Sequence, residues 1–295
     1  MQRRYIWIIV SCLVVFAIYR VHLKLTATPP GPEVANGEIV APYEPTPDVI
    51  VQSMLRLGNV GPQDVVIDLG SGDGRIPVTA ARDFGARGIG IELDPQLLQL
   101  SRDNAKAAGV ADRVNFRAED LFKADLSEGT VITLFLFRWM NLKLRSDLLD
   151  LAPGTRIVAH YHDVGDWHPD REVRVESDTR YRKSWVRLYV VPAKVAGGWR
   201  WEEERGGMRL ERRLAVTQNF QQIDGSLRTE TGRSLTLHDP KLRGAEFSFW
   251  LPQRDGAHML RWHYRGRVEG DRIAGTAEAR DARGVHHLVW TATRD

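Results

Sequence analysis

The chain has 295 residues, 43% of them hydrophobic, which is enough for one large domain or two ordinary ones. Charged residues make up 27%, the formal net charge is only +3, and no long basic run or zinc-type ligand spacing occurs, so composition gives no sign of a nucleic-acid partner or a metal site. Cys12 is the single cysteine, which excludes an internal disulfide.

The N-terminal segment is strongly apolar. About 15 residues, Tyr5 to Tyr19, carry no charge, and arginines and a lysine flank them. A bilayer-spanning helix needs roughly 17 to 25 residues. The alternative is a cleaved signal peptide, but no small-x-small cleavage pattern follows closely. We therefore expect an uncleaved membrane anchor over residues 1–25, whose balanced flanking charges leave its orientation open.

A proline-rich linker, residues 26–40, leads to the first domain, which we place at residues 41–195. Thr46, Pro47 and Asp48 have the pattern of an N-cap, a first-turn proline and an acid that the helix dipole favours. The helix is expected to run to about Leu57.

Strand and helix patterns then alternate. Short apolar runs predict strands at 64–69, 87–93, 113–118, 130–137 and 155–162. Helical patterns lie between them at 75–84, 95–108 and 141–151, the second with Asp94 as its N-cap. Two more strands, 171–177 and 184–191, have no normal helix between them and predict an antiparallel hairpin at one edge. Together these patterns predict an α/β domain with a mostly parallel sheet covered on both faces.

From Trp199 onward the pattern changes to about eight short alternating runs separated by turn signals. Residues 199–295 are therefore predicted to form a small antiparallel barrel-like domain. It holds five of the nine tryptophans, which we expect to fill its core; a ligand-lined barrel mouth is the alternative.

The stretch "VVIDLGSGDGRI" places Gly70, Gly72 and Gly74 between a strand and a helix. Glycine lets the backbone turn tightly and approach a ligand closely. Arg75 stands where a dinucleotide fingerprint needs its third glycine, and no Gly-Lys-Ser/Thr follows, so neither a nicotinamide site nor a P-loop is indicated. The loop alone is also compatible with a simple turn.

Acidic residues follow the next two strands. Glu92 ends the second strand, where a carboxylate can accept hydrogen bonds from both hydroxyls of a ribose. After the third strand, Asp120 can accept from an adenine amino group and the Leu121 N–H can pair with a ring nitrogen, although Asp120 alone also fits a turn. These groups lie at successive strand ends, where open α/β sheets bind ligands.

The stretches "VVIDLGSGDGRI", "GIELDP" and "AEDLF" resemble the sequential motifs of class I S-adenosylmethionine-dependent methyltransferases, over roughly residues 41–192. This implies a Rossmann-like seven-stranded sheet. "PYEPTP", "SRDNAKAAG" and "DLFKADLSE" are similar to a narrower group, the small membrane-anchored lysine methyltransferases of mitochondria and their bacterial relatives. Those enzymes modify a ring protein of ATP synthase or the adenine nucleotide carrier.

The resemblance implies S-adenosyl-L-methionine as cofactor, with the methionine end at Asp68 and the glycine loop, the ribose at Glu92 and the adenine at Asp120 and Leu121. Tyr43 and Thr46 would lie over the methionine and substrate side, although Thr46 also fits a helix cap. The implied cofactor-binding residues are Thr46, Asp68, Gly70, Ser71, Gly72, Asp73, Gly74, Glu92, Asp120 and Leu121.

The predicted catalytic residues are Tyr43, Trp139, His160 and His162. Strand alternation would place the two histidines on one face, positioned to relay a proton from the acceptor; ordinary strand-end histidines are the alternative. Trp139 lies in "FLFRWMN", which differs from the Asn-Pro-Pro-Tyr of adenine- and glutamine-directed enzymes, and either walls the acceptor pocket or packs on a helix. Asp163 and Trp167 are weaker candidates in the same loop.

We therefore expect a methyltransferase acting on a lysine of a membrane-associated protein. A small-molecule or lipid acceptor, or a non-catalytic membrane-tethered binding protein, are the alternatives. Because S-adenosylmethionine is made in the cytosol, we expect a single-pass protein of the bacterial inner membrane with its catalytic domain in the cytoplasm.

Overall fold

The computed structural model describes residues 33–35, 38–40, 43–177, 183–205, 208–229, 232–255, 258–282 and 284–295. The chain divides into two units, Met1–Glu44 and Pro45–Asp295. In the first unit, β1 (Glu33–Ala35) pairs antiparallel with β2 (Glu38–Val40). The predicted membrane anchor, residues 1–25, lies outside the described residues.

The expectation of a single-pass inner-membrane protein is wrong. Across the part of the chain that the structure describes, none of the helices combines the length and the apolar character that crossing a bilayer requires. The transmembrane assignment rested on the uncharged run Tyr5 to Tyr19, the charges that flank it and the absence of a cleavage pattern after it.

The first part of the larger unit is a seven-stranded sheet in the order β5-β4-β3-β6-β7-β9-β8. Its strands are β3 (Val65–Leu69), β4 (Arg87–Glu92), β5 (Val114–Ala118), β6 (Val131–Leu134), β7 (Arg156–His160), β8 (Arg171–Glu176) and β9 (Lys183–Val190). Strands β3 to β7 are parallel, whereas β9 runs antiparallel to both β7 and β8. The predicted Rossmann-like sheet with an edge hairpin is confirmed.

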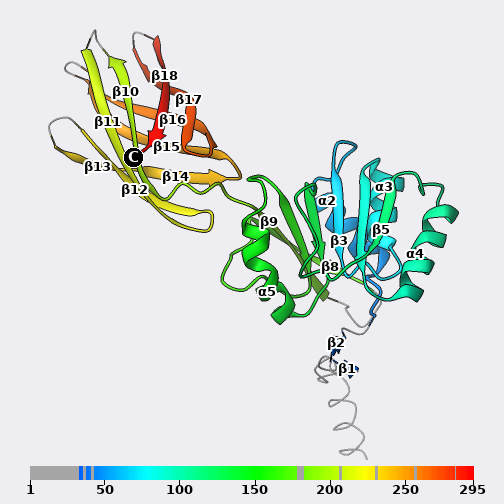
Figure 1. Ribbon diagram of the computed structural model, residues 1–295. Helices are drawn as coiled ribbons and strands as arrows, with labels where there is room; N and C mark the ends of the chain where they lie inside the picture. Colours follow the sequence, from blue (N-terminus) through cyan, green and yellow to red (C-terminus); the bar gives the residue numbers. More distant parts are fainter. Residues whose placement is uncertain are drawn as a thin grey trace, which may run out of the picture. The chain divides into compact units, whose positions relative to one another are not determined.

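Side chains alternate between two apolar layers. Val66, Val131 and Val158 pack with α2 (Asp48–Leu57) and α3 (Arg75–Phe84) on one face. The neighbouring residues, including Ile67 and Ile132, pack with α5 (Arg138–Leu149) on the other face. Helix α4 (Pro95–Ala107) packs against α3 and β5 (Figure 1). Covering both faces leaves the carboxyl edge of the strands as the place for a site.

The helix starts agree with the sequence patterns in one case and differ in two. Asp94 caps α4 by accepting hydrogen bonds from the N–H groups of Gln96 and Leu97. At α2, Pro47 occupies the N-cap position and no side chain caps the helix, so the predicted Thr46 cap is wrong. Helix α5 begins at Arg138, three residues earlier than predicted.

The second part is a nine-stranded antiparallel sheet in the order β13-β12-β11-β10-β18-β17-β16-β15-β14. Its strands are β10 (Gly197–Arg205), β11 (Met208–Asn219), β12 (Gln222–Arg228), β13 (Ser234–Thr236), β14 (His238–Arg243), β15 (Glu246–Asp255), β16 (His258–Glu269), β17 (Arg272–Asp281) and β18 (Gly284–Arg294). The first strand, β10, pairs with the last, β18, which curls the meander into the predicted barrel-like form. A predicted run is split at Leu237, whose N–H donates to the Gly225 carbonyl, which gives nine strands instead of eight.

Tryptophans fill the interior of this second sheet, as the sequence predicted. Four of its five tryptophans are buried: Trp199, Trp201, Trp262 and Trp290. A polar network is buried with them. The Arg212 Nη2 atom lies 2.7 Å from the Glu203 Oε1 atom, and the Tyr264 hydroxyl donates to Glu203. The buried side chains therefore satisfy one another within a packed core.

Candidate active site

Strand β3 leads directly into the glycine loop. Gly70, Gly72 and Gly74 have positive φ angles of 74°, 54° and 77°, which a residue with a Cβ adopts only at a cost. A Cβ on Gly74 would lie 2.7 Å from the Phe116 ring. The glycines are therefore required by the turn itself. Gly70 is exposed and Gly72 is buried, so the loop presents its Gly70 end to solvent.

Glu92 is fixed at the end of β4 by three backbone N–H groups. Its Oε2 accepts from Gly72 at 2.9 Å, and its Oε1 accepts from Leu93 and Asp94 at 2.8 and 3.0 Å. A carboxylate has about four acceptor positions, so one remains on Oε2 for a ligand hydroxyl. The Gly72 N–H serves Glu92 and does not face a ligand. The exposed Leu93 side chain, 62% accessible, adds an apolar surface beside the carboxylate.

Asp68 lies under the loop, at the end of β3. Its side chain is buried, and its Oδ1 accepts a 2.6 Å hydrogen bond from the Thr133 hydroxyl. The pKa of Asp68 is raised to about 7, mainly by burial; the charges of Asp73 and Glu92 act in the same direction, and the hydrogen bond from Thr133 acts against them. The carboxyl group therefore sits near the midpoint of its titration at neutral pH, which is typical of functional sites.

The remaining predicted cofactor residues have defined positions. Asp73 is held by Arg75, whose Nη2 lies 2.6 Å from its Oδ2, and Arg75 also donates to the Thr46 carbonyl. Thr46 is buried, with 5% exposure. The Ser71 hydroxyl is buried and has no hydrogen-bond partner among the described residues. These residues shape the loop and the start of α2.

Asp120 forms a turn after β5 while keeping part of its carboxylate accessible. Its Oδ1 accepts from the Phe122 N–H at 2.9 Å, and its Oδ2 lies 3.5 Å from the Lys123 Nζ. Leu121 follows as a half-buried residue. Asp120 therefore forms a turn here, and 34% of its side-chain surface remains exposed.

The end of β7 differs from the sequence expectation. His160 is fully buried and its ring lies 4.2 Å from the Phe135 ring. Burial, with a smaller contribution from the charge of His162, lowers the pKa of His160 to about 3. Tyr161 has a φ of 68°, so strand alternation stops there and does not carry His160 and His162 onto one face. A proton relay from His160 is therefore not supported.

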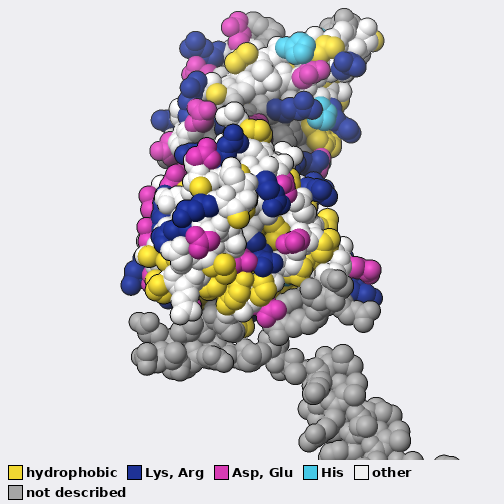
Figure 2. Space-filling model, turned by 90° about the vertical axis from the view of Figure 1, so that its right-hand side faces the viewer, with side chains coloured by type: hydrophobic (Ala, Val, Ile, Leu, Met, Phe, Trp, Pro, Cys, Tyr) yellow, Lys and Arg dark blue, Asp and Glu magenta, His cyan; other side chains and the backbone are white. Residues whose placement is uncertain are grey.

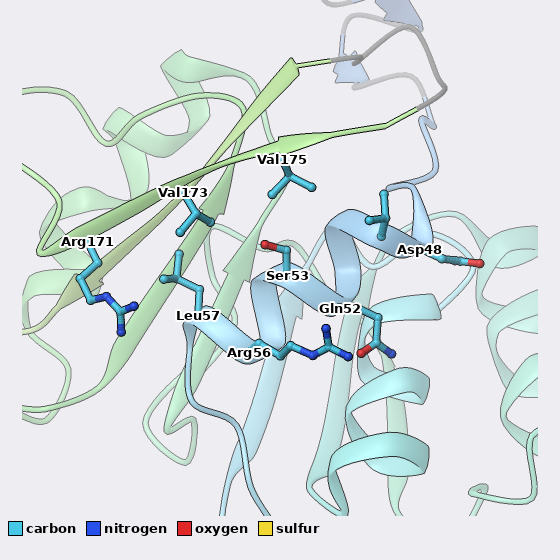
Figure 3. Close-up of a pocket in the computed structure, with 9 residues that line it drawn as sticks. Asp48, Gln52, Ser53, Arg56, Leu57, Arg171, Val173 and Val175 are labelled. Carbon is cyan, nitrogen blue, oxygen red and sulfur yellow. The ribbon is translucent and has the colours of Figure 1, made fainter.

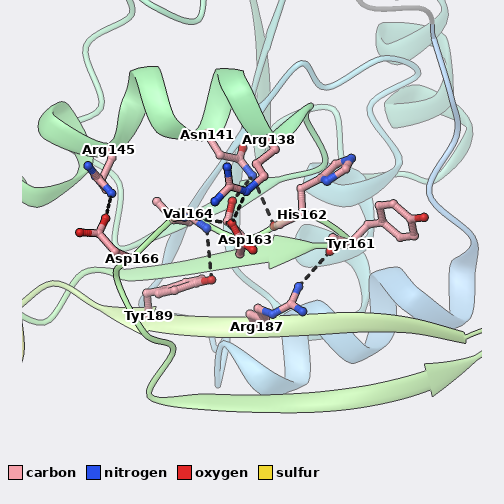
Figure 4. A network of polar contacts seen from close by, with 11 residues as sticks. Arg138, Asn141, Arg145, Tyr161, His162, Asp163, Val164, Asp166, Arg187 and Tyr189 are labelled. Carbon is pink, nitrogen blue, oxygen red and sulfur yellow. Dashed lines mark hydrogen bonds and ion pairs between the residues drawn. The ribbon is translucent and has the colours of Figure 1, made fainter. Parts of the chain in front are cut away.

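Tyr161 is the residue at this edge that sequence reasoning missed. A positive φ is rare for a bulky residue and costs of order 1–2 kcal/mol. Three hydrogen bonds hold this turn. The Tyr161 N–H donates to the Trp185 carbonyl, and the His162 N–H donates to the His160 carbonyl. Arg187 donates to the Tyr161 carbonyl (Figure 4). Its side chain is 39% exposed, and no sequence signal marks the strain, because tyrosine has no preference for positive φ.

The other predicted catalytic residues lie at separate places. Trp139 is in the first turn of α5, 36% exposed, with its ring 6.1 Å from the Phe122 ring. Asp163 accepts from Arg138 and from the Gly165 N–H. Trp167 is fully buried and packs against Phe220 of the second sheet, which makes it a core residue. Tyr43 is exposed and belongs to the smaller unit.

The registers bring the loop and Tyr161 to one edge. Leu69, Leu134 and Ala159 are aligned across β3, β6 and β7. The loop follows β3 and Tyr161 follows β7, and these strands are two positions apart in the sheet, a separation of about 10 Å at ~4.8 Å per strand.

An open groove of about 590 Å³ lies elsewhere, between α2 and β8. Its walls include Leu57, Val173 and Val175, and none of the loop residues lines it (Figure 3).

Comparison with known proteins decides the family. A family model described as the ANTKMT methyltransferase domain matches residues 68–171. A protein-lysine N-methyltransferase of Saccharolobus islandicus (strain REY15A) is 38% identical over 152 residues, 51% of this chain and 93% of that protein. The chain belongs to the class I S-adenosylmethionine-dependent methyltransferases.

Two further similarities are to a lysine N-methyltransferase and to a solved RNA methyltransferase. A lysine N-methyltransferase of Mus musculus, named for its action on ATP synthase, is 29% identical over 196 residues, 65% of this chain and 74% of that protein. A solved RNA methyltransferase of Salinibacter ruber, in complex with S-adenosyl-L-homocysteine, is 50% identical; the match covers 52% of this chain and 96% of that chain, with a TM-score of 0.48.

The residues present fit S-adenosylmethionine, the cofactor of this family. The Gly70 backbone is exposed in the loop between β3 and α3, where the absence of a Cβ lets a ligand group approach closely. Glu92 keeps one acceptor position, and Leu93 provides an exposed apolar surface next to it. The ends of β3, β4 and β5 thus offer polar and apolar groups in the order that a nucleoside with an amino-acid tail needs.

Proposed function

We propose that this methyltransferase transfers a methyl group to the side-chain amine of a lysine in a partner protein. The observation that carries the proposal is the similarity to a protein-lysine N-methyltransferase of which this chain covers 93%. The conformation at the end of β7 supports it, because an exposed aromatic ring is held there on a strained backbone.

The cofactor-binding roles are part of the proposal. Bound S-adenosylmethionine supplies a methyl group on a positively charged sulfur, which makes the transfer favourable. Glu92 accepts a ribose hydroxyl on its remaining Oε2 position, and Leu93 packs against the adenine. Asp120 accepts from the adenine amino group through Oδ2. Because backbone N–H groups fix Glu92 in advance, little ordering accompanies binding.

Asp68 has a charge-dependent role at the methionine end. Its buried carboxyl group, with a pKa of about 7, gains from a nearby ammonium group because an opposite charge favours the ionised form. Asp68 and the Gly70 backbone therefore hold the amino-acid end of the cofactor. This binding also aligns the reacting groups, which is the main contribution that a protein makes to an in-line transfer.

The acceptor amine must lose its proton before it reacts, because an unperturbed lysine has a pKa near 10.4. A nonpolar, aromatic surrounding lowers that pKa by disfavouring the charged form. We assign this surrounding to Tyr161 and Trp139, both partly exposed at the carboxyl edge. His160 keeps a neutral, buried ring that packs against the Phe135 ring.

We further propose that the acceptor protein is membrane-associated. Support comes from the mouse relative that is named for ATP synthase, and from a second mouse relative, an adenine nucleotide translocase lysine N-methyltransferase, which is 38% identical over 122 residues, 40% of this chain and 51% of that protein. If so, the labelled acceptor will separate with the membrane fraction of a cell extract.

The test is methyl transfer to an extract of cells that lack this gene. Purified protein is incubated with tritiated S-adenosylmethionine and with the separated membrane and soluble fractions, and labelled products are identified by mass spectrometry. A methyl mark on a lysine, absent with the Glu92→Ala variant, supports the proposal. Label in RNA, in lipid or on another side chain overturns it, as does a lack of any label.

A further inference from the structure

The outer face of the second sheet carries a concentration of arginines. Strand β16 alternates strictly, so that Arg261, His263 and Arg265 are exposed while Leu260, Trp262 and Tyr264 between them are buried. These three and Arg280 of β17 surround an open hollow of about 340 Å³. We call Arg261, His263, Arg265 and Arg280 the basic face.

The basic face continues across neighbouring strands. Arg265 lies opposite Thr276, which lies opposite Val289 of β18, and Arg280 lies opposite Val285. Val289 is 78% exposed and Val285 is 40% exposed. The surface therefore combines guanidinium groups with an apolar margin. In the space-filling view, histidine, basic and hydrophobic side chains lie close together on the C-terminal domain (Figure 2).

The arginines of the basic face differ from those elsewhere on the same sheet. Arg267 pairs with Glu246, and Arg294 pairs with Asp271. Within the described residues, Arg265 and Arg280 form no ion pair, although Glu278 lines the same hollow. Unpaired guanidinium groups beside exposed valines are typical of a protein-binding surface, where arginine is enriched and apolar contacts add affinity.

Trp250 helps to decide what kind of partner fits. Its ring centroid lies 4.0 Å from that of His238, stacked at 14°, and 4.1 Å from the Arg261 guanidinium carbon. Two groups this close to one centroid cannot share a ring face, and they come from β14 and β16, which flank β15. Both faces of the indole are therefore covered. Single-stranded nucleic acid needs an open aromatic face for stacking, which this surface does not offer.

We propose that the basic face, with Val285 and Val289 at its margin, binds an acidic segment of a partner protein that also contains apolar residues. Carboxylates would accept paired hydrogen bonds from the planar guanidinium groups of Arg265 and Arg280. The apolar residues would cover the two valines. This goes beyond the proposed methyl transfer, because it assigns a binding role to the domain outside the methyltransferase sheet.

The experiment measures binding of the full chain to a fluorescent peptide of about ten residues that repeats Glu-Glu-Val-Val, so that each face of the extended peptide carries both residue types. At ~3.3 Å per residue the peptide spans β16, β17 and β18. We expect the double variant Arg265→Glu/Arg280→Glu to weaken binding by roughly 100-fold, since two charge-assisted contacts become repulsive. Val289→Ser should weaken it by about threefold. The control variant Arg209→Glu/Arg213→Glu makes the same charge change on β11, at exposed arginines that have acidic partners, and should change affinity by less than about twofold.

Several outcomes overturn the proposal. They are failure of the wild-type chain to bind the peptide, equal loss with the control variant, and tighter binding of a single-stranded DNA oligonucleotide that the double variant abolishes. S-adenosylmethionine binding is measured on every variant. It should not change, so failure of the docking proposal and failure of the methyltransferase proposal give different results.

Discussion

The two sheets bury polar groups in opposite ways. In the seven-stranded sheet, Asp68 and Ser71 are buried at the end of β3 and in the glycine loop, and His160 is buried at the end of β7. In the nine-stranded sheet, Glu203 and Arg212 are buried in the middle of the core and satisfy each other. Burying a polar group costs free energy unless it is hydrogen-bonded. In the first sheet the buried polar groups lie near the carboxyl edge, where a site is expected. In the second sheet they bond to one another inside the core.

The same contrast holds for backbone strain. Phe220 and Tyr161 both have positive φ angles. Phe220 lies at the turn between β11 and β12, and its ring stacks on Trp167 in a core. Tyr161 instead keeps a partly exposed ring at the end of β7. The backbone strain at Phe220 is explained by the packing of its ring in the core. The strain at Tyr161 holds an exposed ring, which points to a function. The contrast predicts that variants in the core of the nine-stranded sheet change stability, whereas variants at the carboxyl edge of the seven-stranded sheet change cofactor binding or activity.

The largest expected effect is on stability, in the second sheet. Glu203→Ala leaves the buried Arg212 without its counter-charge, which costs about 3–5 kcal/mol. Thermal unfolding followed by tryptophan fluorescence should shift down by roughly 10 °C, with S-adenosylmethionine affinity unchanged. The apolar double replacement Glu203→Met/Arg212→Leu is the control and should recover most of the loss. A simultaneous loss of cofactor binding would mean that the two sheets do not divide these roles.

Asp68→Asn should reverse that pattern by stabilising the fold while weakening the site. Because burial raises the pKa of Asp68 from 3.8 to about 7, the folded state binds more protons than the unfolded state between these pH values. The wild-type free energy of unfolding therefore falls as the pH rises through this window, by at most ~4 kcal/mol. The variant lacks this decline. Urea unfolding at pH 5 and pH 8 checks it; equal pH dependence in both proteins would contradict the raised pKa.

Much of the first sheet could be predicted because its signals are local. Glycine spacing, the acid that ends β4 and the Asp94 cap act through their own backbone neighbours, which the sequence lists in order. Errors occurred where tertiary contacts decided. The apolar run 130–137 predicts a strand, but β6 ends at Leu134. Leu136 instead lies under the loop, 3.2 Å from the position of a Cβ on Gly70.

The conformation of Tyr161 could not be predicted for a related reason. Its positive φ is held by hydrogen bonds to Trp185 and Arg187, more than twenty residues away in the sequence. Tyrosine itself does not favour that conformation, so the sequence pattern predicts that the alternation of β7 continues to His162. The basic face is different again, because the register of β16 on β17 brings its arginines together and the register of β17 on β18 adds the valines.

Glu92→Ala is expected to act mainly on the site, with a smaller cost to the fold because three backbone N–H groups lose their acceptor. It removes the carboxylate that bridges the loop to β4, and we expect S-adenosylmethionine affinity to fall by roughly 100-fold, the equivalent of ~3 kcal/mol. Asp94→Ala, two residues away, removes the α4 cap and should cost about 1 kcal/mol of stability while leaving cofactor affinity intact. Isothermal titration calorimetry on both variants measures this. Similar affinities for the two would remove Glu92 from the cofactor site.

The smallest expected effect falls on Tyr161 and tests whether its strain serves the acceptor. Tyr161→Asn places a residue that tolerates positive φ at this position and removes the ring, so the fold should keep its stability within about 1 kcal/mol. Loss of an aromatic contact to the amine should lower kcat/KM for the labelled acceptor by about 10-fold, with cofactor affinity unchanged. Tyr161→Phe keeps the ring and should retain most of the activity. Full activity in the Asn variant would show that the ring has no part in acceptor binding, and a parallel loss of cofactor affinity would place it in the cofactor pocket instead. The first result would leave the strain at the end of β7 to be explained by packing, as it is at Phe220, whereas the second would assign it to cofactor binding.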